Sequence, residues 1–239
     1  RSEMYKEYKA NRPAMPEGLI PQIPYIKRII EGYRIATFEI EGYEADDIIG
    51  SLVKRYPDWD INVLSSDKDL LQLIDKTTSV WLMKKGLTEI EKMDEAALKE
   101  MWGLRPDQIP DLKGLMGDTS DNIPGLPGVG EKTALKLLEE YGSVESVIEN
   151  SHKLKGKLKE TVETYFEKAT FSKWLATIKT DAEFELDLNQ ALFQPNIKTA
   201  NDFFMKYEMK SLIKELNSNN NHNSENTDFN QLDKEGYIS

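Results

Sequence analysis

The chain has 239 residues, with 42 Asp and Glu against 31 Lys and Arg, a net charge of -11, two His and no Cys. This length suffices for one or two domains with a real hydrophobic core. The missing cysteines exclude disulfides, thiolate zinc sites and cysteine nucleophiles, and the two histidines lie in polar stretches, which argues against Ser-His-Asp triads. Catalysis would therefore rely on carboxylates. With no apolar run of about 18 residues, the composition is typical of a soluble, cytoplasmic protein.

The first part of the chain predicts helices. Residues 1–20 are polar and rich in proline and glycine toward their end, which predicts a short helix and then an irregular connection. Residues 21–32 carry isoleucines at helical spacing. Residues 44–56 place their apolar side chains on one stripe, so this segment also predicts an amphipathic helix.

Short β-branched segments lie between and after these helices. RIATFEI (34–40) and DINVLSS (60–66) predict strands, and residues 79–85 and 87–93 predict a hairpin or a pair of edge strands. Strands that alternate with helices indicate a parallel α/β sheet.

The second half of the chain predicts helices alone, joined by Gly and Pro turns. Beyond them, seven Asn lie between residues 217 and 230, and this composition predicts a disordered linker over 216–239. The predicted helices are 94–102, 106–116, 131–141, 144–149 and 154–178.

Three groups of acidic residues stand where a helix or loop is expected to follow a strand or helix. The carboxyl ends of parallel strands share one edge of a sheet, so the first two groups should meet there. Without His or Cys, a carboxylate cluster suits hard divalent cations such as Mg²⁺, and two ions about 4 Å apart can activate a water for phosphodiester hydrolysis. A purely structural role remains open, because acids are favoured in the first turn of any helix. The groups are Glu44, Asp46 and Asp47; Asp67 and Asp69; and Asp118 and Asp121.

A glycine-rich turn precedes the helix predicted at 131–141. Gly128 and Gly130 let the backbone approach a ligand, and the free amides of a helix N-terminus favour an anion such as phosphate. The turn is neither a Walker loop nor a Rossmann turn. Nearby lysines favour a DNA backbone, although six acids between 126 and 160 balance them, and a tight turn between packed helices is the alternative.

Four sequence motifs, taken in chain order, resemble those of the 5'-nuclease (5'-3' exonuclease) domains of bacterial DNA polymerases, which belong to the flap endonuclease family. The opening RSEMYKEYKANRP also resembles the helical arch of that family, and the resemblance covers roughly residues 1–215. The four motifs are GYEADD (42–47), SSDKDLLQL (65–73), GDTSDNIPG (117–125) and GLPGVGEKTA (125–134).

The resemblance implies an α/β fold: a parallel-sheet, PIN-like nuclease core followed by a helical region with a helix-three-turn-helix DNA-binding element. The domains that it implies are a helical-arch remnant at 1–20, the core at 21–105, the helical DNA-binding region at 106–215 and the linker at 216–239.

The resemblance also implies roles for individual residues. Lys9 and Arg12 would be catalytic and, with the DNA-binding Tyr8, would steer the scissile phosphate. DNA would be bound further at the glycine turn, which can also hold K⁺, and a two-metal site would hold Mg²⁺ or Mn²⁺. The turn residues are Gly128, Gly130 and Lys132, and the metal ligands are Glu44, Asp46, Asp47, Asp67, Asp69, Asp118 and Asp121.

The implied function is cleavage of 5' flaps, nicks and 5' ends of DNA in bacterial replication and repair, in the cytoplasm at the nucleoid and away from membranes. A C-terminal polymerase domain would follow in the full-length protein. The family pattern places an Asp-bearing strand and a second Asp before Arg1, so we expect the chain as given to be impaired. The alternatives are a non-catalytic DNA-binding module and an acidic protein-interaction domain without DNA contact.

Overall fold

The computed structural model describes residues 1–86, 88–185, 188–193 and 197–214. The chain forms two compact units. The first comprises Arg1–Ala14 and Glu39–Phe184, and the second comprises Met15–Phe38 and the described residues from Glu185 onward. The linker predicted at 216–239 lies outside the described residues. Among the helices described, none combines the length and apolar character needed to cross a membrane.

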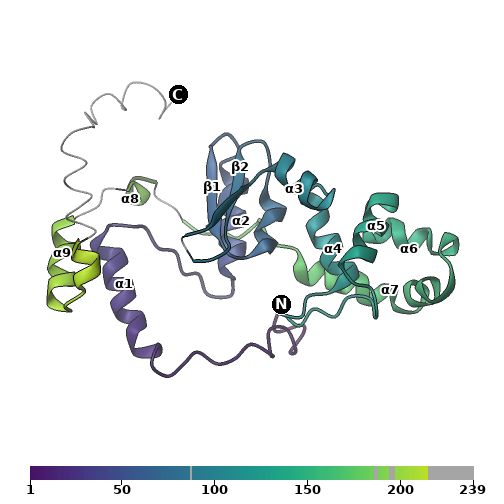
Figure 1. The fold of residues 1–239 in the computed structure, drawn as a ribbon, viewed down its shortest axis with the longest axis horizontal. Coiled ribbons are helices and arrows are strands. Elements are labelled where there is room, and N and C mark those ends of the chain that lie inside the picture. Colours follow the sequence, from purple (N-terminus) through teal and green to yellow (C-terminus); the bar gives the residue numbers. More distant parts are fainter. Residues whose placement is uncertain (87, 186–187, 194–196, 215–239) are drawn as a thin grey trace. The chain divides into compact units, whose positions relative to one another are not determined.

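The first unit contains a sheet of three strands in the order β1-β2-β3 (Figure 1). Their bounds are Ile61–Ser65, Thr78–Met83 and Ile90–Met93. The pair β1 and β2 is parallel, as the sequence predicts, whereas β3 is antiparallel to β2, so the hairpin is confirmed and the sheet is mixed. One face buries Val63, Val80 and Met93, which lie in register across the three strands.

Two sequence predictions in the first forty residues are wrong. Residues 34–40 form no strand, and Ile35 and Phe38 are 47% and 37% exposed. A β-branched segment becomes a strand only where a neighbouring strand pairs with its backbone, and no such ladder forms here in the described residues. The predicted short helix within 1–20 is a series of hydrogen-bonded turns, which Lys9 interrupts with a φ of 58°.

The helices of the first unit follow the predicted ranges closely. Asp94 and Ser143 cap the N-termini of two of them with side-chain oxygens, as their residue types favour. The long predicted helix has a kink at Tyr165, where φ is -118°. The elements are α2 (Ala45–Arg55), η2 (Lys68–Leu73), α3 (Glu95–Trp102), η3 (Pro106–Gln108), α4 (Ile109–Met116), α5 (Glu131–Tyr141), α6 (Val144–Glu149), η4 (Ser151–Lys153) and α7 (Gly156–Ala176).

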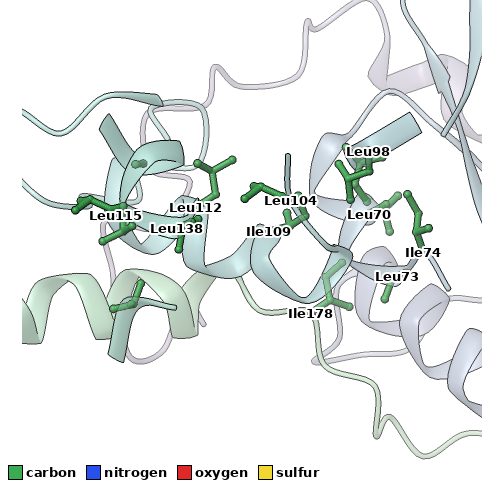
Figure 2. Packing of buried hydrophobic residues seen from close by; sticks show 14 of the residues in the cluster. Leu70, Leu73, Ile74, Leu98, Leu104, Ile109, Leu112, Leu115, Leu138 and Ile178 are labelled. Atoms are coloured by element: carbon green, nitrogen blue, oxygen red, sulfur yellow. The ribbon is translucent and has the colours of Figure 1, made fainter. Parts of the chain in front are cut away.

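A continuous hydrophobic core runs from the sheet side of this unit into its helical side. Figure 2 shows Leu70 and Leu98 at one end, Leu104 and Ile109 in the middle and Leu112 further along. Because the core is shared, the α/β part and the helical part form one packed body.

A buried acid ties three helices of the helical side together. The Asp111 carboxylate of α4 accepts a hydrogen bond from the Val144 amide at the start of α6 (2.8 Å) and pairs with Lys173 of α7 (2.6 Å). This network satisfies a polar group that would be costly to bury alone.

The second unit contains η1 (Ile20–Gln22), α1 (Ile23–Gly32), α8 (Leu188–Ala191) and α9 (Ile197–Lys206). The helix predicted at 21–32 is thereby confirmed. Its Tyr25 lies edge-on to Tyr207 at 5.1 Å, and Tyr33 contacts Phe204, which is 2% exposed.

Candidate functional site

Carboxylates from three separate segments line one small pocket in the first unit. Glu44 and Asp46 lie at the N-terminus of α2, Asp69 lies in η2 just after β1, and Asp121 lies in the loop after α4. The apolar side of the pocket is formed by Leu175, Ala176 and Ile178 at the end of α7, and Arg1 and Tyr8 also line it. Residues of the two acidic groups that were expected to meet therefore do approach one another, although in the described residues no strand precedes the first group.

The N-terminus of α2 fixes Glu44 and Asp47 through a reciprocal capping box. Arg1 donates two hydrogen bonds to the Asp47 carboxylate, at 2.8 and 3.0 Å, and the Lys179 amide donates a third at 2.9 Å. Burial would raise the pKa of Asp47, but the Arg1 hydrogen bonds outweigh it and the pKa is lowered. In this structure Asp47 anchors the chain around the pocket, while its neighbour Asp46 faces the pocket.

Asp46 lies among negative charges that the nearby cation of Lys9 offsets only in part. Burial, followed by the charge of Asp67, raises the pKa of Asp46 to about 6, and Glu44 and Asp69 add to the effect. Like charges that crowd together in this way are what a bound cation would relieve.

Replacing Asp46 should therefore stabilise the fold. A carboxylate with a raised native pKa stabilises the fold below its unfolded pKa of about 3.9, and this stabilisation is lost as pH rises through about 6. Above pH 6, Asp46→Asn should raise the free energy of unfolding by about 1–2 kcal/mol, after allowance for solvent screening. Urea unfolding at pH 8 and pH 4 measures it. The gain should shrink at pH 4, the exposed control Asp58→Asn should show none, and a loss of stability at pH 8 would contradict the assignment.

The second acidic group is organised by β1, η2 and a lysine from α4. Asp67 caps η2 by accepting the Asp69 amide at 2.9 Å. The ammonium of Lys113 lies 2.8 Å from Asp69 Oδ1 and donates a hydrogen bond to Asp118. Burial raises the pKa of Asp69, whereas hydrogen bonds from Lys113 and Ser120 overcome burial and lower the pKa of Asp118.

The N-terminal segment contacts Asp121 of the third acidic group and also Glu44 of the first. Lys9 lies 2.5 Å from Glu44 and 3.6 Å from Asp121, and Arg12 lies 2.5 Å from Asp121. Tyr8 is buried, and burial raises its pKa to about 12, so it is a neutral phenol at neutral pH. The three residues assigned to the arch by resemblance thus lie against the acidic pocket.

The donor set suits a hard divalent cation, because it consists of carboxylate oxygens in a partly buried pocket. Within the described residues, however, no three acidic or histidine side chains are arranged closely enough to hold a metal ion. The cations of Arg1, Lys9, Arg12 and Lys113 instead neutralise most of the carboxylates. The carboxylate ligands are therefore of the type that binds a divalent metal ion. In this structure, however, the positions around them are taken by the side-chain cations of the protein itself.

The glycine turn places its exposed backbone beside the N-terminus of α5. Buried Val129 and Leu126 anchor the turn, while Gly128, with a φ of 75°, and Gly130 are exposed. Gly130 is the N-cap of α5 and has no side chain that could cap the helix, so an anion could accept from the first-turn amides of Glu131 and Lys132, while the Thr133 amide donates to the Gly130 carbonyl at 3.0 Å. Lys132 is exposed in the first turn of the same helix.

Sequence reasoning missed two residues of the site, Arg1 and Lys113. Both are more than four-fifths buried and pair with acids far away in the chain. Lys113 also pairs with Asp118, five residues away, and this spacing was a usable signal. Nothing in the local sequence distinguishes Arg1.

Two consecutive family models match the chain. Residues 1–103 match the model described as 5'-3' exonuclease, N-terminal resolvase-like domain, and residues 104–200 match 5'-3' exonuclease, C-terminal SAM fold. The chain therefore belongs to the 5'-3' exonuclease family of nucleases.

Particular relatives agree with this assignment. DNA polymerase I of Bacillus caldotenax is 48% identical over 81% of this chain, and DNA polymerase I of Streptococcus pneumoniae TIGR4 is 41% identical over 98%. The chain spans 22% and 27% of the length of these polymerases. The resemblance to the 5'-nuclease domains of bacterial DNA polymerases is thereby confirmed.

Solved structures share the fold. The structure of T5 5'-exonuclease with bound divalent zinc ions matches with a TM-score of 0.64 and 25% identity, over 86% of this chain and 77% of that one. The catalytic core of Rad2 in complex with DNA substrate matches with a TM-score of 0.51 and 15% identity, over 85% and 69% of the two chains. The second match supports the α/β and helical architecture alone.

Proposed function

We propose that this chain is a metal-dependent 5'-3' exonuclease and flap endonuclease that acts on branched or nicked DNA in replication and repair. The single observation that carries the proposal is the pocket where Glu44, Asp46, Asp69 and Asp121 converge from three segments of the chain. Family membership supports the reaction class, and the divalent zinc ions bound to T5 5'-exonuclease support metal dependence.

In this proposal the acidic groups hold Mg²⁺ or Mn²⁺. When bound, such ions orient a water and neutralise the charge of the phosphodiester. Lys9 and Arg12 place positive charge at the pocket rim and orient the scissile phosphate, while neutral Tyr8 supports them from the buried side. The proposed ligands are Glu44, Asp46, Asp47, Asp67, Asp69, Asp118 and Asp121.

The glycine turn is proposed to bind the DNA backbone away from the cut. Contacts with the phosphate groups would come from the first amides of α5, the exposed Gly128 and Gly130, and the charge of Lys132. None of these groups recognises base edges, so DNA binding should be largely independent of sequence. K⁺ is the further ion proposed for this turn. The DNA partner and the C-terminal polymerase domain of the longer protein are part of the same proposal.

The non-catalytic DNA-binding module is the second candidate. The observation that favours it is that the described carboxylates are neutralised by internal cations and hold no group of three arranged for a metal. In that case the helical side of the unit binds DNA and the acidic pocket has a structural role.

Cleavage of a 5'-labelled flap separates the two candidates. It is measured with Mg²⁺ or Mn²⁺ on the chain and on the chain extended by the first strand of the family, because the resemblance implies two further aspartates before Arg1. We expect the extended protein to cleave, and Asp46→Asn to lower the rate by about a hundredfold or more, since misplaced metals cost about that much.

The exposed Asp58→Asn should leave cleavage unchanged. Flap binding that weakens with rising salt and with Gly130→Val, without cleavage by either protein, would favour the DNA-binding module. Cleavage that survives Asp46→Asn would refute the assigned site.

A further inference from the structure

The first twelve residues form a strap that is bound to the loop containing two of the acidic residues. The strap is defined as residues 1–12, and the loop as residues 117–123. The Lys9 amide donates to the Asp121 carbonyl at 2.9 Å, the Asn11 amide side chain donates to the Thr119 carbonyl at 2.6 Å, and Asn122 donates to the Glu7 carbonyl at 2.7 Å. The backbone of the strap is therefore aligned along the rim of the pocket.

Side chains of the strap enter the acidic pocket itself. Lys9 reaches both Glu44 (2.5 Å) and Asp121 (3.6 Å), and Arg12 reaches Asp121 (2.5 Å). Tyr8, which directly precedes Lys9, packs in a small apolar cluster with Ile123 and the end of α7. The strap thus brings two positive charges to a place where acids converge from three other segments.

These two charges neutralise carboxylates that the proposed function assigns to a divalent cation. The oxygen of Glu44 that contacts Lys9 also accepts a hydrogen bond from Tyr8, and Asp121 is 8% exposed at its side chain with both cations against it. A carboxylate oxygen cannot keep a direct contact with an ammonium and also serve as an inner ligand of a metal without rearrangement.

We propose that the strap is an internal counter-ion that competes with the divalent cation for Glu44 and Asp121, an inference that rests on the proposed function. Without metal, Lys9 and Arg12 close over the acids. When a metal ion binds to Glu44 and Asp121, their carboxylates no longer pair with Lys9 and Arg12. These two side chains are then available to contact a DNA phosphate. Metal and DNA backbone therefore favour each other, and the linkage is reciprocal.

Metal affinity gives the first test. Mn²⁺ binding is measured from the electron paramagnetic resonance signal of free Mn²⁺, without DNA and without any cleavage. Lys9→Met should tighten Mn²⁺ binding by about tenfold or more, because it removes a competing charge within a few ångströms of two ligands. Lys6→Met removes the same charge from an exposed position of the same strap and should leave the affinity unchanged.

Movement of the strap gives the second test. The chain has no cysteine, so Ala10→Cys offers a single position for a nitroxide label on the exposed side of the strap, and Ala96→Cys on α3 is the matched control. We expect millimolar Mg²⁺ to increase label mobility at position 10 and to leave position 96 unchanged.

The outcomes separate this inference from the proposed function. If Asp46→Asn weakens Mn²⁺ binding, the nuclease proposal stands. If, in the same measurements, Lys9→Met does not tighten Mn²⁺ binding and Mg²⁺ does not increase the mobility of the label at position 10, the strap inference is overturned. If Mn²⁺ binds to none of the variants, both proposals fail.

Discussion

Gly125→Ala should destabilise the chain by about 3 kcal/mol or more, because the alanine would face both a clash and a strained backbone. Gly125 is buried and has a φ of 59°, in the left-handed region that favours glycine. A Cβ atom built on it would lie 2.2 Å from the Gly117 amide nitrogen and 2.5 Å from the Met116 carbonyl carbon. Both contacts are with backbone, so no flexible side chain can move aside.

The effect should extend to the acidic site. Between Gly117 and Gly125 in the chain, Asp118 and Ile123 form an antiparallel bridge in which each amide donates a hydrogen bond to the carbonyl of the other residue, at 2.7 and 2.8 Å. Separation of Gly117 from Gly125 would open that bridge and shift the loop that carries Asp118 and Asp121.

Urea unfolding measures the change, with Gly128→Ala as the control. Gly128 has a similar φ of 75°, but a Cβ there meets nothing within 4 Å, so only the backbone strain of about 1 kcal/mol remains. Equal losses for the two variants would show that backbone conformation alone, and not the close approach, requires glycine at 125.

The helices of the first unit could be predicted because their apolar stripes and caps are local properties. Asp94 and Ser143 mark helix starts, and the predicted helix at 131–141 coincides with α5. Local patterns fail where a segment depends on a distant partner. RIATFEI has the composition of a strand, yet strand formation requires a paired backbone that the composition of the segment cannot specify.

The acids of the site were predictable from the sequence and Lys9 and Arg12 from the family resemblance, whereas two further cations, Arg1 and Lys113, were missed. Asp67 and Asp69 follow β1, where the topology of a sheet gathers polar residues, and Asp46 lies in the first turn of α2, which periodicity locates. The strand predicted before α2 does not form, so sheet topology does not account for the approach of Asp46 to the other two acids. The partner of Asp47 is Arg1, 46 residues away, and the partner of Asp69 is Lys113 on a different helix. Such long-range charge pairs leave no trace in composition or spacing.

Lys113→Met should have the largest effect among the charged residues of the site. The Lys113 side chain is 16% exposed and lies between Asp69 and Asp118, which are 13% and 12% exposed. Burial would lower the pKa of Lys113, but the charges and hydrogen bonds of the two acids raise it, so the ammonium is charged at neutral pH. Methionine fills a similar volume and leaves two buried carboxylates facing each other.

We expect Lys113→Met to lower the free energy of unfolding by about 3–5 kcal/mol at pH 7, the usual cost of removing one partner from a buried ion pair. The loss should depend on pH in a defined direction. In the variant, burial and mutual repulsion raise the native pKa of Asp69 and Asp118 above the unfolded value of about 3.9, so native carboxylates take up protons first as the pH falls. The stability of the variant relative to the unsubstituted chain should therefore recover as the pH falls from 7 to 5, and it should be lost again as the pH rises.

Urea unfolding of both proteins at pH 5 and pH 8 tests this, and Lys99→Met, at an exposed position of α3, controls for the loss of one positive charge. The control should change stability little at either pH. A deficit for Lys113→Met that is the same at both pH values would mean that lost packing, and not the uncompensated charge of Asp69 and Asp118, is what the lysine prevents. Recovery at pH 5 would instead establish that Lys113 is the cation that allows two acids of the proposed metal site to lie together in the absence of metal.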